Sequence, residues 1–314
     1  MIKLSILIPI YNVEKYFSRC LDSLFHEQAK DLVEYIFVDD CSKDESVNIL
    51  KTYMSKHPEE NIRLITHEHN QGLAAARLTG ITHAEGVYVW CIDSDDWIEN
   101  DAIDILLKNI GDERLDIIWF SAKWHGGENY NRRPKTNADT ILYNLAWASI
   151  WSCITKKDFL LKNNILPYIG YNYGEDFNMT ARMACMTNST KQIKDILYNY
   201  RRESSGSYTD LCVNKNREMK LLLEKTRGTL NVINYYRSQN KFDKHRRAIF
   251  FNQANMLNQL KRYNIDCADE TRQLHDNMNA CRMATRWFDL IGDFAGYKIQ
   301  RYYIRILRRI FLMF

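Results

Sequence analysis

Three carboxylates stand close together after a short apolar run, Val87–Trp90, at positions Asp93, Asp95 and Asp96. The apolar run predicts a buried strand, and carboxylates crowded at its end repel one another unless a positive group neutralises them. Mg²⁺ and Mn²⁺ take oxygen ligands and keep positions open for the oxygens of a bound diphosphate. The segment therefore predicts a metal site for a diphosphate or, alternatively, a solvated turn in which Asp96 or Asn100 caps a helix.

Polar clusters also follow three earlier apolar runs. Residues 4–10 predict a strand that stops at Pro-Ile-Tyr-Asn, residues 33–38 one that ends in Asp-Asp-Cys-Ser, and residues 62–66 one that leads into Asn-Gln-Gly. Helical spacing of apolar residues follows, for example in residues 13–24, and residues 115–120 predict a fifth strand. This alternation predicts an α/β fold with a mostly parallel sheet, in which ligands bind beyond the carboxyl ends of the strands.

The side chains at these strand ends suggest a nucleotide-binding rim. Asp39 could accept a hydrogen bond from the imide N–H of uracil, and Tyr11 could stack on the base. Arg77 offers a fork of donors for base or phosphate, and Gly72 would let the main chain approach a ligand at a helix start. Each residue also has a purely structural explanation, as turn former, hinge or ion-pair partner, but four clusters at four strand ends favour a shared site. The candidates for donor binding here are Pro9, Tyr11, Asp39, Asp40, Asn70, Gly72, Arg77 and Asp93.

Four motifs together make the chain recognisable. The segments Ser5–Asn12, Val38–Ser42, Asn70–Arg77 and Asp93–Trp97 resemble, in order and spacing, those of the family 2 inverting glycosyltransferases, which have the GT-A fold. The resemblance covers about the first two thirds of the chain. It implies a transferase that uses a nucleotide sugar together with Mn²⁺ or Mg²⁺.

The resemblance also implies roles for single residues. In the family's Asp-x-Asp motif, Asp95 corresponds to the metal ligand and Asp93 to the residue near the ribose. Either Asp39 or Asp40 would meet the uracil base. One small departure is Leu78, where many relatives have asparagine, and it puts little in doubt.

A second acidic pair, Glu175-Asp176, follows Tyr171–Gly174 at the start of a predicted helix. Transfer with inversion needs a carboxylate that takes the proton from the attacking acceptor hydroxyl, while a metal stabilises the departing diphosphate. The resemblance gives the role of base to the aspartate, Asp176, and leaves Glu175 to position the acceptor or support the loop. The alternative is an acidic helix N-terminus that the helix dipole favours.

The acceptor side has weaker signals. Residues 121–143 lack periodicity and predict loops, where substrate recognition usually lies. Trp147 and Trp151 are four residues apart, so on a helix they would share a face, one packed in the core and the other free to stack on a sugar. We take Trp151 and Asp96 as candidates for acceptor binding.

A basic, serine-rich segment follows the last predicted strand, residues 193–200. Arg201, Ser205 and Ser207 loosely fit a family segment that closes over the diphosphate, and they complete the candidates for donor binding. A plain surface loop is the alternative.

Composition limits the remaining possibilities. The net charge of +4 does not indicate a nucleic-acid partner, and eight cysteines without a Cys-x-x-Cys pair are typical of a reducing compartment. No segment has the roughly 18 consecutive apolar residues of a membrane span, so we expect a cytoplasmic protein. We expect a GT-A catalytic domain over residues 1–210, with a nucleotide-sugar half (1–120) and an acceptor half (121–210), and an all-helical region over residues 211–314.

Residues 299–314 predict a basic amphipathic helix. Four arginines share one sector of the helical wheel, and aromatic and aliphatic residues fill the remainder. Such a helix fits the interface of an anionic membrane, on the inner face of the cell membrane, where lipid-linked acceptors lie. The alternative is a helix that docks on its own domain or on a second subunit.

The sequence therefore predicts a metal-dependent inverting glycosyltransferase that moves one sugar from a nucleotide sugar, expected to be a UDP-sugar, to a glycan or lipid-linked acceptor in surface polysaccharide synthesis. Processive synthases that look similar carry Gln-x-x-Arg-Trp, and Met283 stands here at the glutamine position before Arg286-Trp287. The absence of a Gly-rich turn after the first strand argues against nucleotidyltransferases and dinucleotide oxidoreductases. The non-enzyme alternative is a catalytically silent, membrane-docked nucleotide-binding protein on the same fold.

Overall fold

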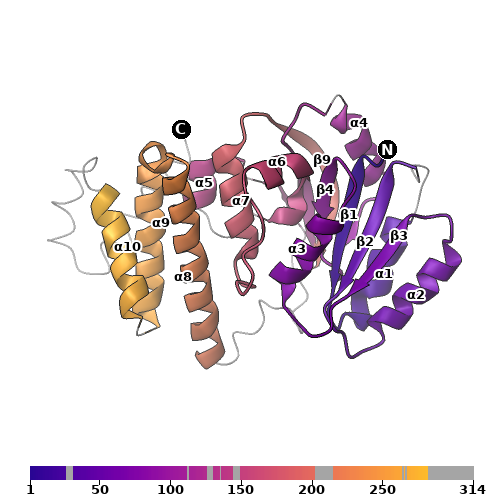
Figure 1. Ribbon diagram of the computed structural model, residues 1–314, viewed down its shortest axis with the longest axis horizontal. Helices are drawn as coiled ribbons and strands as arrows, with labels where there is room; N and C mark the ends of the chain where they lie inside the picture. Colours follow the sequence, from indigo (N-terminus) through magenta and orange to yellow (C-terminus); the bar gives the residue numbers. More distant parts are fainter. Residues whose placement is uncertain are drawn as a thin grey trace.

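The protein combines a mixed sheet with flanking helices and a group of C-terminal helices. The computed structural model describes residues 1–25, 31–111, 113–125, 130–134, 136–143, 149–201, 215–263, 265 and 267–281. Within these ranges a nine-stranded sheet lies toward one end of the molecule, and helices α8 to α10 lie toward the other (Figure 1). This arrangement is the predicted α/β fold with a helical C-terminal part.

The first four strands form the parallel part of the sheet, in the order β3-β2-β1-β4. The register sets Ile10 beside Asp39 and Asp39 beside Thr66, so three strands end at the same level. The four strands were predicted from the sequence, and the polar clusters follow their carboxyl ends. Their bounds are Leu4–Ile10 for β1, Val33–Asp39 for β2, Ile62–Thr66 for β3 and Tyr88–Cys91 for β4.

Beyond β4 the strands pair mainly in antiparallel fashion. β8 (Cys153–Lys156) is antiparallel to β4 and to β6 (Ile117–His125), and β9 (Thr190–Arg201) is parallel to β6. β5 (Trp97–Ile98) pairs antiparallel with β9, and β7 (Tyr130–Arg132) with β6. The expectation of a mostly parallel sheet therefore holds for β1 to β4 and fails for the later strands. Antiparallel pairs need no crossover helix, so the sequence carries a weaker signal for them.

Helices cover both faces of the sheet. Alternate residues of a buried strand point to opposite faces of the sheet. In β1, Leu7 therefore packs in the apolar cluster that includes α3, α5, α6 and α7. Ile6 and Ile8 pack on the opposite face, in the cluster that includes α1, α2 and α4. Burial on both faces explains why these strands read as continuous apolar runs. The helices span Glu14–Leu24 (α1), Ser46–Lys56 (α2), Leu73–His83 (α3), Ala102–Ile110 (α4), Ala138–Tyr143 (α5), Lys157–Lys162 (α6) and Glu175–Met186 (α7), with a short 3-10 helix at Ile150–Ser152 (η1).

The C-terminal helices are α8 (Lys215–Ser238), α9 (Phe242–Arg262) and α10 (Ala268–Cys281). α8 packs on α7, α9 packs on α5, and α10 packs on α9 and α8 (Figure 1). The Tyr236 hydroxyl donates a hydrogen bond to the carbonyl of Ala181 at 2.8 Å. Residues of α8 and α9 share the apolar cluster on the α3 face of the sheet, so α8 and α9 share a hydrophobic core with the sheet. The division of the chain at residue 210 stays a prediction.

Several predictions concern residues outside the described ranges: Trp147, Ser205, Ser207 and the helix at 299–314. Residues 121–143, expected as loops, contain the end of β6, β7 and α5 in their described part. The cysteines of the described ranges are unpaired. Within the same ranges, no helix is both long enough and apolar enough to cross a bilayer.

Candidate active site

Arg77 of α3 joins the Asp-rich segment after β4 to the acidic pair that begins α7. Its Nη2 donates to Asp93 Oδ1 at 2.7 Å. Its Nη1 donates to Glu175 Oε1 at 2.8 Å and to Asp176 Oδ1 at 2.9 Å. The guanidinium is almost fully buried, 2% exposed, so a single positive charge holds three carboxylates from distant parts of the chain together.

The two carboxylates of the pair differ in their surroundings. Burial, reinforced by repulsion from Asp176, raises the pKa of Glu175 to about 8, against the attraction of Arg77. Burial raises the pKa of Asp176 to about 6, and Arg77 again opposes the shift. At neutral pH the pair therefore retains one proton, and Glu175, whose pKa is raised further, is the favoured site for it. Carboxylates whose pKa values are pushed apart can divide acid and base roles between them.

A second guanidinium neutralises the other side of the Asp-rich segment. Arg201, the last residue of β9, donates from Nη2 to Asp95 Oδ2 at 2.7 Å and from Nε to the Asp95 carbonyl at 3.3 Å. Its guanidinium carbon lies 3.6 Å from the centre of the Tyr16 ring. The Asp95 side chain remains 33% exposed, so a ligand can still reach it.

Asp96 lies behind this rim, 1% exposed. Its Oδ2 accepts a hydrogen bond from the Tyr198 hydroxyl at 2.6 Å, and its Oδ1 accepts one from the main-chain N–H of Arg201 at 2.7 Å. The Tyr198 hydroxyl in turn accepts a hydrogen bond from the Asp93 N–H at 3.2 Å. Asp96 thus fastens the Asp-rich segment to β9, and its suggested contact with an acceptor stays a prediction.

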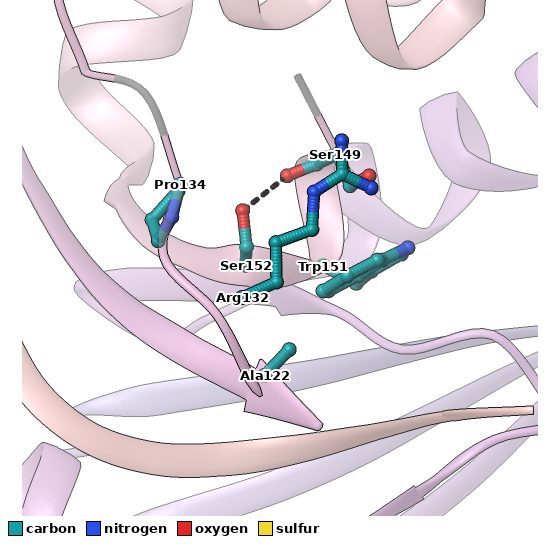
Figure 2. A pocket seen from close by; sticks show the side chains of 6 residues that line it. All are labelled: Ala122, Arg132, Pro134, Ser149, Trp151 and Ser152. Carbon is teal, nitrogen blue, oxygen red and sulfur yellow. Dashed lines mark hydrogen bonds between the residues drawn. The ribbon is translucent and has the colours of Figure 1, made fainter. Parts of the chain in front are cut away.

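Trp151 supports the same segment from the interior. Its ring stacks on Tyr198 with centroids 4.5 Å apart and planes 6° apart, and its carbonyl accepts a hydrogen bond from Trp90 Nε1 at 2.9 Å. The residue is 4% exposed and borders a small hollow, in which the Arg132 side chain extends past it toward Ser149 (Figure 2). The hollow is lined by Ala122, Arg132, Pro134, Ser149, Trp151 and Ser152. Acceptor stacking on Trp151 stays a prediction.

On the nucleotide side, the two aspartates after β2 have different environments. Asp40 accepts hydrogen bonds from the main-chain N–H groups of Gln71 at 2.8 Å and Gly72 at 2.7 Å, and it contacts His67 Nδ1 at 2.7 Å. Asp39 accepts one from the N–H of Ser42 at 3.0 Å. Asp40 therefore holds the loop before α3, and Asp39 is the better candidate for a hydrogen bond to a nucleotide base.

The remaining donor candidates border this rim. Tyr11 is 47% exposed directly after β1, where a base could cover its ring. Pro9 is buried within β1, opposite Val38 in the register. Asn70 is exposed and donates from Nδ2 to the Asp40 carbonyl at 3.2 Å.

Sequence reasoning missed the roles of Tyr16 and Tyr198. Tyr16 occupies an ordinary position on the apolar side of α1, so no local signal distinguishes it. Tyr198 lies in the predicted last strand, but nothing in the sequence indicates its contacts with Asp93 and Asp96, which lie about 100 residues away.

Comparison with known proteins identifies the family. The model of glycosyl transferase family 2 matches residues 5–185, and the chain belongs to this family. EpsH, a putative glycosyltransferase of Bacillus subtilis, is 31% identical over 210 residues, which are 63% of this chain and 60% of EpsH. The chain thus spans less than two thirds of the length of several curated relatives that it matches.

Solved structures agree with this fold. The Staphylococcus aureus TarS 1-349 structure in complex with UDP-GlcNAc has a TM-score of 0.60 at 20% identity and covers 91% of this chain and 92% of that one. The mannosyltransferase PcManGT of Pyrobaculum calidifontis, in complex with GDP-Man and Mn²⁺, has a TM-score of 0.55 at 14% identity and covers 90% and 80% of the two chains. The chain therefore has the GT-A fold.

The carboxylates fit a metal that binds together with a substrate. Within the described ranges no three His, Cys, Asp or Glu side chains form a ready metal cage. Mg²⁺ and similar ions are commonly held by one or two carboxylates plus substrate phosphates, without an all-protein cage. Asp95 and Asp93, both partly exposed and both paired with arginines, supply that kind of hard oxygen donor.

Proposed function

We propose that the protein is a metal-dependent inverting glycosyltransferase. It moves one sugar from a UDP-sugar to a glycan or lipid-linked acceptor in surface polysaccharide synthesis. The observation that carries this proposal is the Arg77 guanidinium, which holds Asp93 of the Asp-rich segment and the Glu175–Asp176 pair in one site. A donor-side carboxylate and a candidate base therefore lie around the same group.

In the proposed reaction Asp176 takes the proton from the acceptor hydroxyl as its oxygen attacks the anomeric carbon. Ionisation of Asp176 near neutral pH and its fixed contact with Arg77 suit this role. Glu175, which holds a proton at neutral pH, supports the loop or donates a hydrogen bond to the acceptor. The protonated Glu175 also limits the repulsion that Asp176 experiences.

Two groups of residues serve the departing nucleotide. Asp95 would hold Mn²⁺ or Mg²⁺, with Asp93 beside it near the ribose, and the ion would stabilise the negative charge that develops on the diphosphate. Arg201, which pairs with Asp95, would donate hydrogen bonds to phosphate oxygens. Ser205 and Ser207 belong to the same proposed segment.

The donor base would lie against the ends of β1 and β2. Asp39 would accept the imide N–H of uracil, Tyr11 would stack on the ring, and Pro9, Asp40, Asn70 and Gly72 would shape the pocket. The TarS complex with UDP-GlcNAc supports a UDP-sugar as donor. The PcManGT complex with GDP-Man and Mn²⁺ supports a metal, and it makes a GDP-sugar the competing donor class.

We further propose that residues 299–314 attach the enzyme to an anionic membrane surface on its cytoplasmic side. The support is the sequence of that segment, with its four arginines on one face. Vesicles of anionic lipid should sediment the full chain and should not sediment a chain that ends at residue 298. Equal sedimentation of both chains excludes the segment as the anchor.

Thermal unfolding of the full chain against UDP, GDP, CDP and ADP, each with and without Mn²⁺, tests the donor class. A ligand at 100 times its dissociation constant adds about 2.7 kcal/mol of apparent stability. We expect selective stabilisation by UDP with Mn²⁺. Stabilisation by GDP alone would contradict the role of Asp39 on uracil, and the absence of any shift would favour a silent protein on the same fold.

A further inference from the structure

The loop before α7 is seated on the N-terminus of α3. Asn172 accepts a hydrogen bond on Oδ1 from the main-chain N–H of Ala74 at 3.0 Å. The first N–H groups of a helix lack partners within the helix, and Gly72, the residue before α3, has no side chain to supply one. Asn172 therefore caps a helix from a loop about 100 residues farther along the chain.

Gly72 makes room for this contact. Its φ is +91°, and a Cβ added there would lie 2.3 Å from Nδ2 of Asn172. A side chain at position 72 would thus be strained in its backbone and would collide with Asn172. The sequence suggested that Gly72 admits a ligand, and the structure adds a second reason for glycine, which is the close approach of the acceptor-side loop.

The contact links the two sides of the candidate site. On the donor side, the N–H of Gly72 donates to Asp40, which holds the loop at Asn70–Gly72 after β3. On the acceptor side, the acidic pair begins only three residues after Asn172, at Glu175. The carboxylate of Glu224 in α8 accepts a hydrogen bond from the Tyr173 N–H at 2.7 Å and holds the same loop from its other side.

α3 therefore contacts the start of α7, which carries the proposed general base Asp176, at two points. Asn172 accepts a hydrogen bond from the first turn of α3, and Arg77, one turn later in α3, binds both Glu175 and Asp176. Arg77 fixes the carboxylates themselves, whereas Asn172 fixes the main chain that leads to them. With the loop released, the carboxylates could still pair with Arg77 but would do so from a displaced helix start.

We propose that Asn172 is a positioning residue, which holds the Glu175–Asp176 pair in register with the donor loop. This inference rests on the proposed function, since the geometry matters only if Asp176 acts on an acceptor aligned with the bound donor. A displacement of about 1 Å in such a site can lower the rate about 100-fold.

Asn172→Ala and Asn172→Asp test the proposal, with Asn163→Ala as matched control. Aspartate keeps the oxygen that accepts from Ala74, and the Asn172 Nδ2 that it replaces donates no hydrogen bond within the described ranges. Asn163 also lies in the acceptor half and makes one side-chain hydrogen bond to the main chain, to Phe159 at 2.8 Å, away from α3. Because aspartate adds a charge near the pair, each variant is assayed across its full pH profile.

The readouts are UDP release from the UDP-sugar that best stabilises the wild type, and calorimetric affinity for UDP with Mn²⁺. For Asn172→Ala we expect kcat to fall about 10-fold to 100-fold while donor affinity changes less than about threefold. Asn172→Asp should regain most of the lost kcat at its own optimum, and Asn163→Ala should match the wild type. Asn172→Ser, whose side chain is too short to reach Ala74, replaces Asn172→Ala if that variant does not fold.

Three results would overturn the inference: an unchanged kcat in the alanine or serine variant, an equal loss of donor affinity and kcat, or an aspartate variant as slow as the alanine variant. A wild-type protein that neither binds UDP with Mn²⁺ nor releases UDP overturns the proposed function, and this inference with it. An active wild type with an indifferent Asn172 overturns the inference alone.

Discussion

Arg201 Nη2 lies 2.7 Å from Asp95 Oδ2, so a protein cation already neutralises the carboxylate that we propose as the metal ligand. The Nη1 atom of Arg201 is buried and has no hydrogen-bond partner within the described ranges. An unsatisfied charged donor is unfavourable unless a ligand completes it. The Arg201–Asp95 ion pair is thus suited to separate when a metal binds Asp95 and a diphosphate binds Arg201.

Arg201→Gln should strengthen the binding of Mn²⁺ alone and weaken that of UDP. Removal of the guanidinium leaves Asp95 free for the metal, and we expect about tenfold tighter Mn²⁺ binding, as the loss of a charge in direct contact predicts. Electron paramagnetic resonance of free Mn²⁺ measures the first effect, and calorimetry of UDP at saturating Mn²⁺ the second.

Arg19→Gln controls for net charge, because Arg19 stacks on the Trp97 ring at 3.2 Å near the same segment. Equal gains in Mn²⁺ affinity from both variants would show a general charge effect and would contradict a specific competition between Arg201 and the metal.

Asp176→Asn should bind UDP with Mn²⁺ as the wild type does and lose transfer. Loss of a positioned general base typically lowers the rate about 10²-fold to 10⁴-fold. Calorimetry and UDP release separate the two steps. Asp195→Asn, an exposed carboxylate on β9, should leave both steps unchanged. Wild-type turnover by Asp176→Asn would exclude Asp176 as the base.

Glu175→Gln should stabilise the metal-free protein at alkaline pH. Because the pKa of Glu175 is raised from its ordinary value of 4.5 to about 8 in the folded state, the folded state binds an extra proton between these two values, and its stability falls as pH rises through them. Glutamine removes that dependence. The free energy of unfolding in urea should exceed that of the wild type by at least about 1 kcal/mol above pH 8 and match it near pH 4, below the unfolded-state pKa.

Glu68→Gln, at an exposed position, should show the pH dependence of the wild type. A Glu175→Gln variant that is less stable than the wild type at alkaline pH would contradict the assignment of the buried proton to Glu175.

Arg77→Lys should destabilise the protein and abolish turnover. A single ammonium cannot reproduce the planar fork that reaches Asp93 and the acidic pair together, and weakening a buried ionic network should lower the free energy of unfolding by at least about 2 kcal/mol. Arg227→Lys is the control, because Arg227 pairs with Glu270 with its side chain 52% exposed and should change stability by less than about 1 kcal/mol. Chemical unfolding measures both, and an Arg77→Lys variant as stable and active as the wild type would rule out the shared counter-ion.

The parallel half of the sheet and its rim were predictable because their signals are local. Buried strands such as Leu4–Ile10 read as apolar runs, and polar clusters mark their ends, so the fold rule alone brings Asp39 and Asp93 to one edge. The choice between Asp39 and Asp40 was not predictable, since it depends on the three hydrogen-bond partners that Asp40 finds in the loop after β3.

The contacts between α3 and α7 lay beyond sequence reasoning. Arg77 and Asp176 are 99 residues apart, and an arginine in the first turns of a helix can point to a ligand as easily as to a distant carboxylate. Asn172 carries no motif, and its role depends on the space that Gly72 leaves. The strands β5, β7 and β8 were missed because they have only two to four residues and, unlike the equally short β4, none of them is a continuous run of four apolar residues.

The anomeric configuration of the sugar that the enzyme first releases tests the central claim most directly. Proton magnetic resonance can follow an α-linked UDP-sugar with Mg²⁺, because paramagnetic Mn²⁺ would broaden the signals, with water as acceptor where no glycan is supplied, before the product mutarotates. We expect a β-configured product from the wild type and release at least about 10²-fold slower from Asp176→Asn. An α-configured product, or release that persists at the wild-type rate in Asp176→Asn, would contradict inversion with Asp176 as the base.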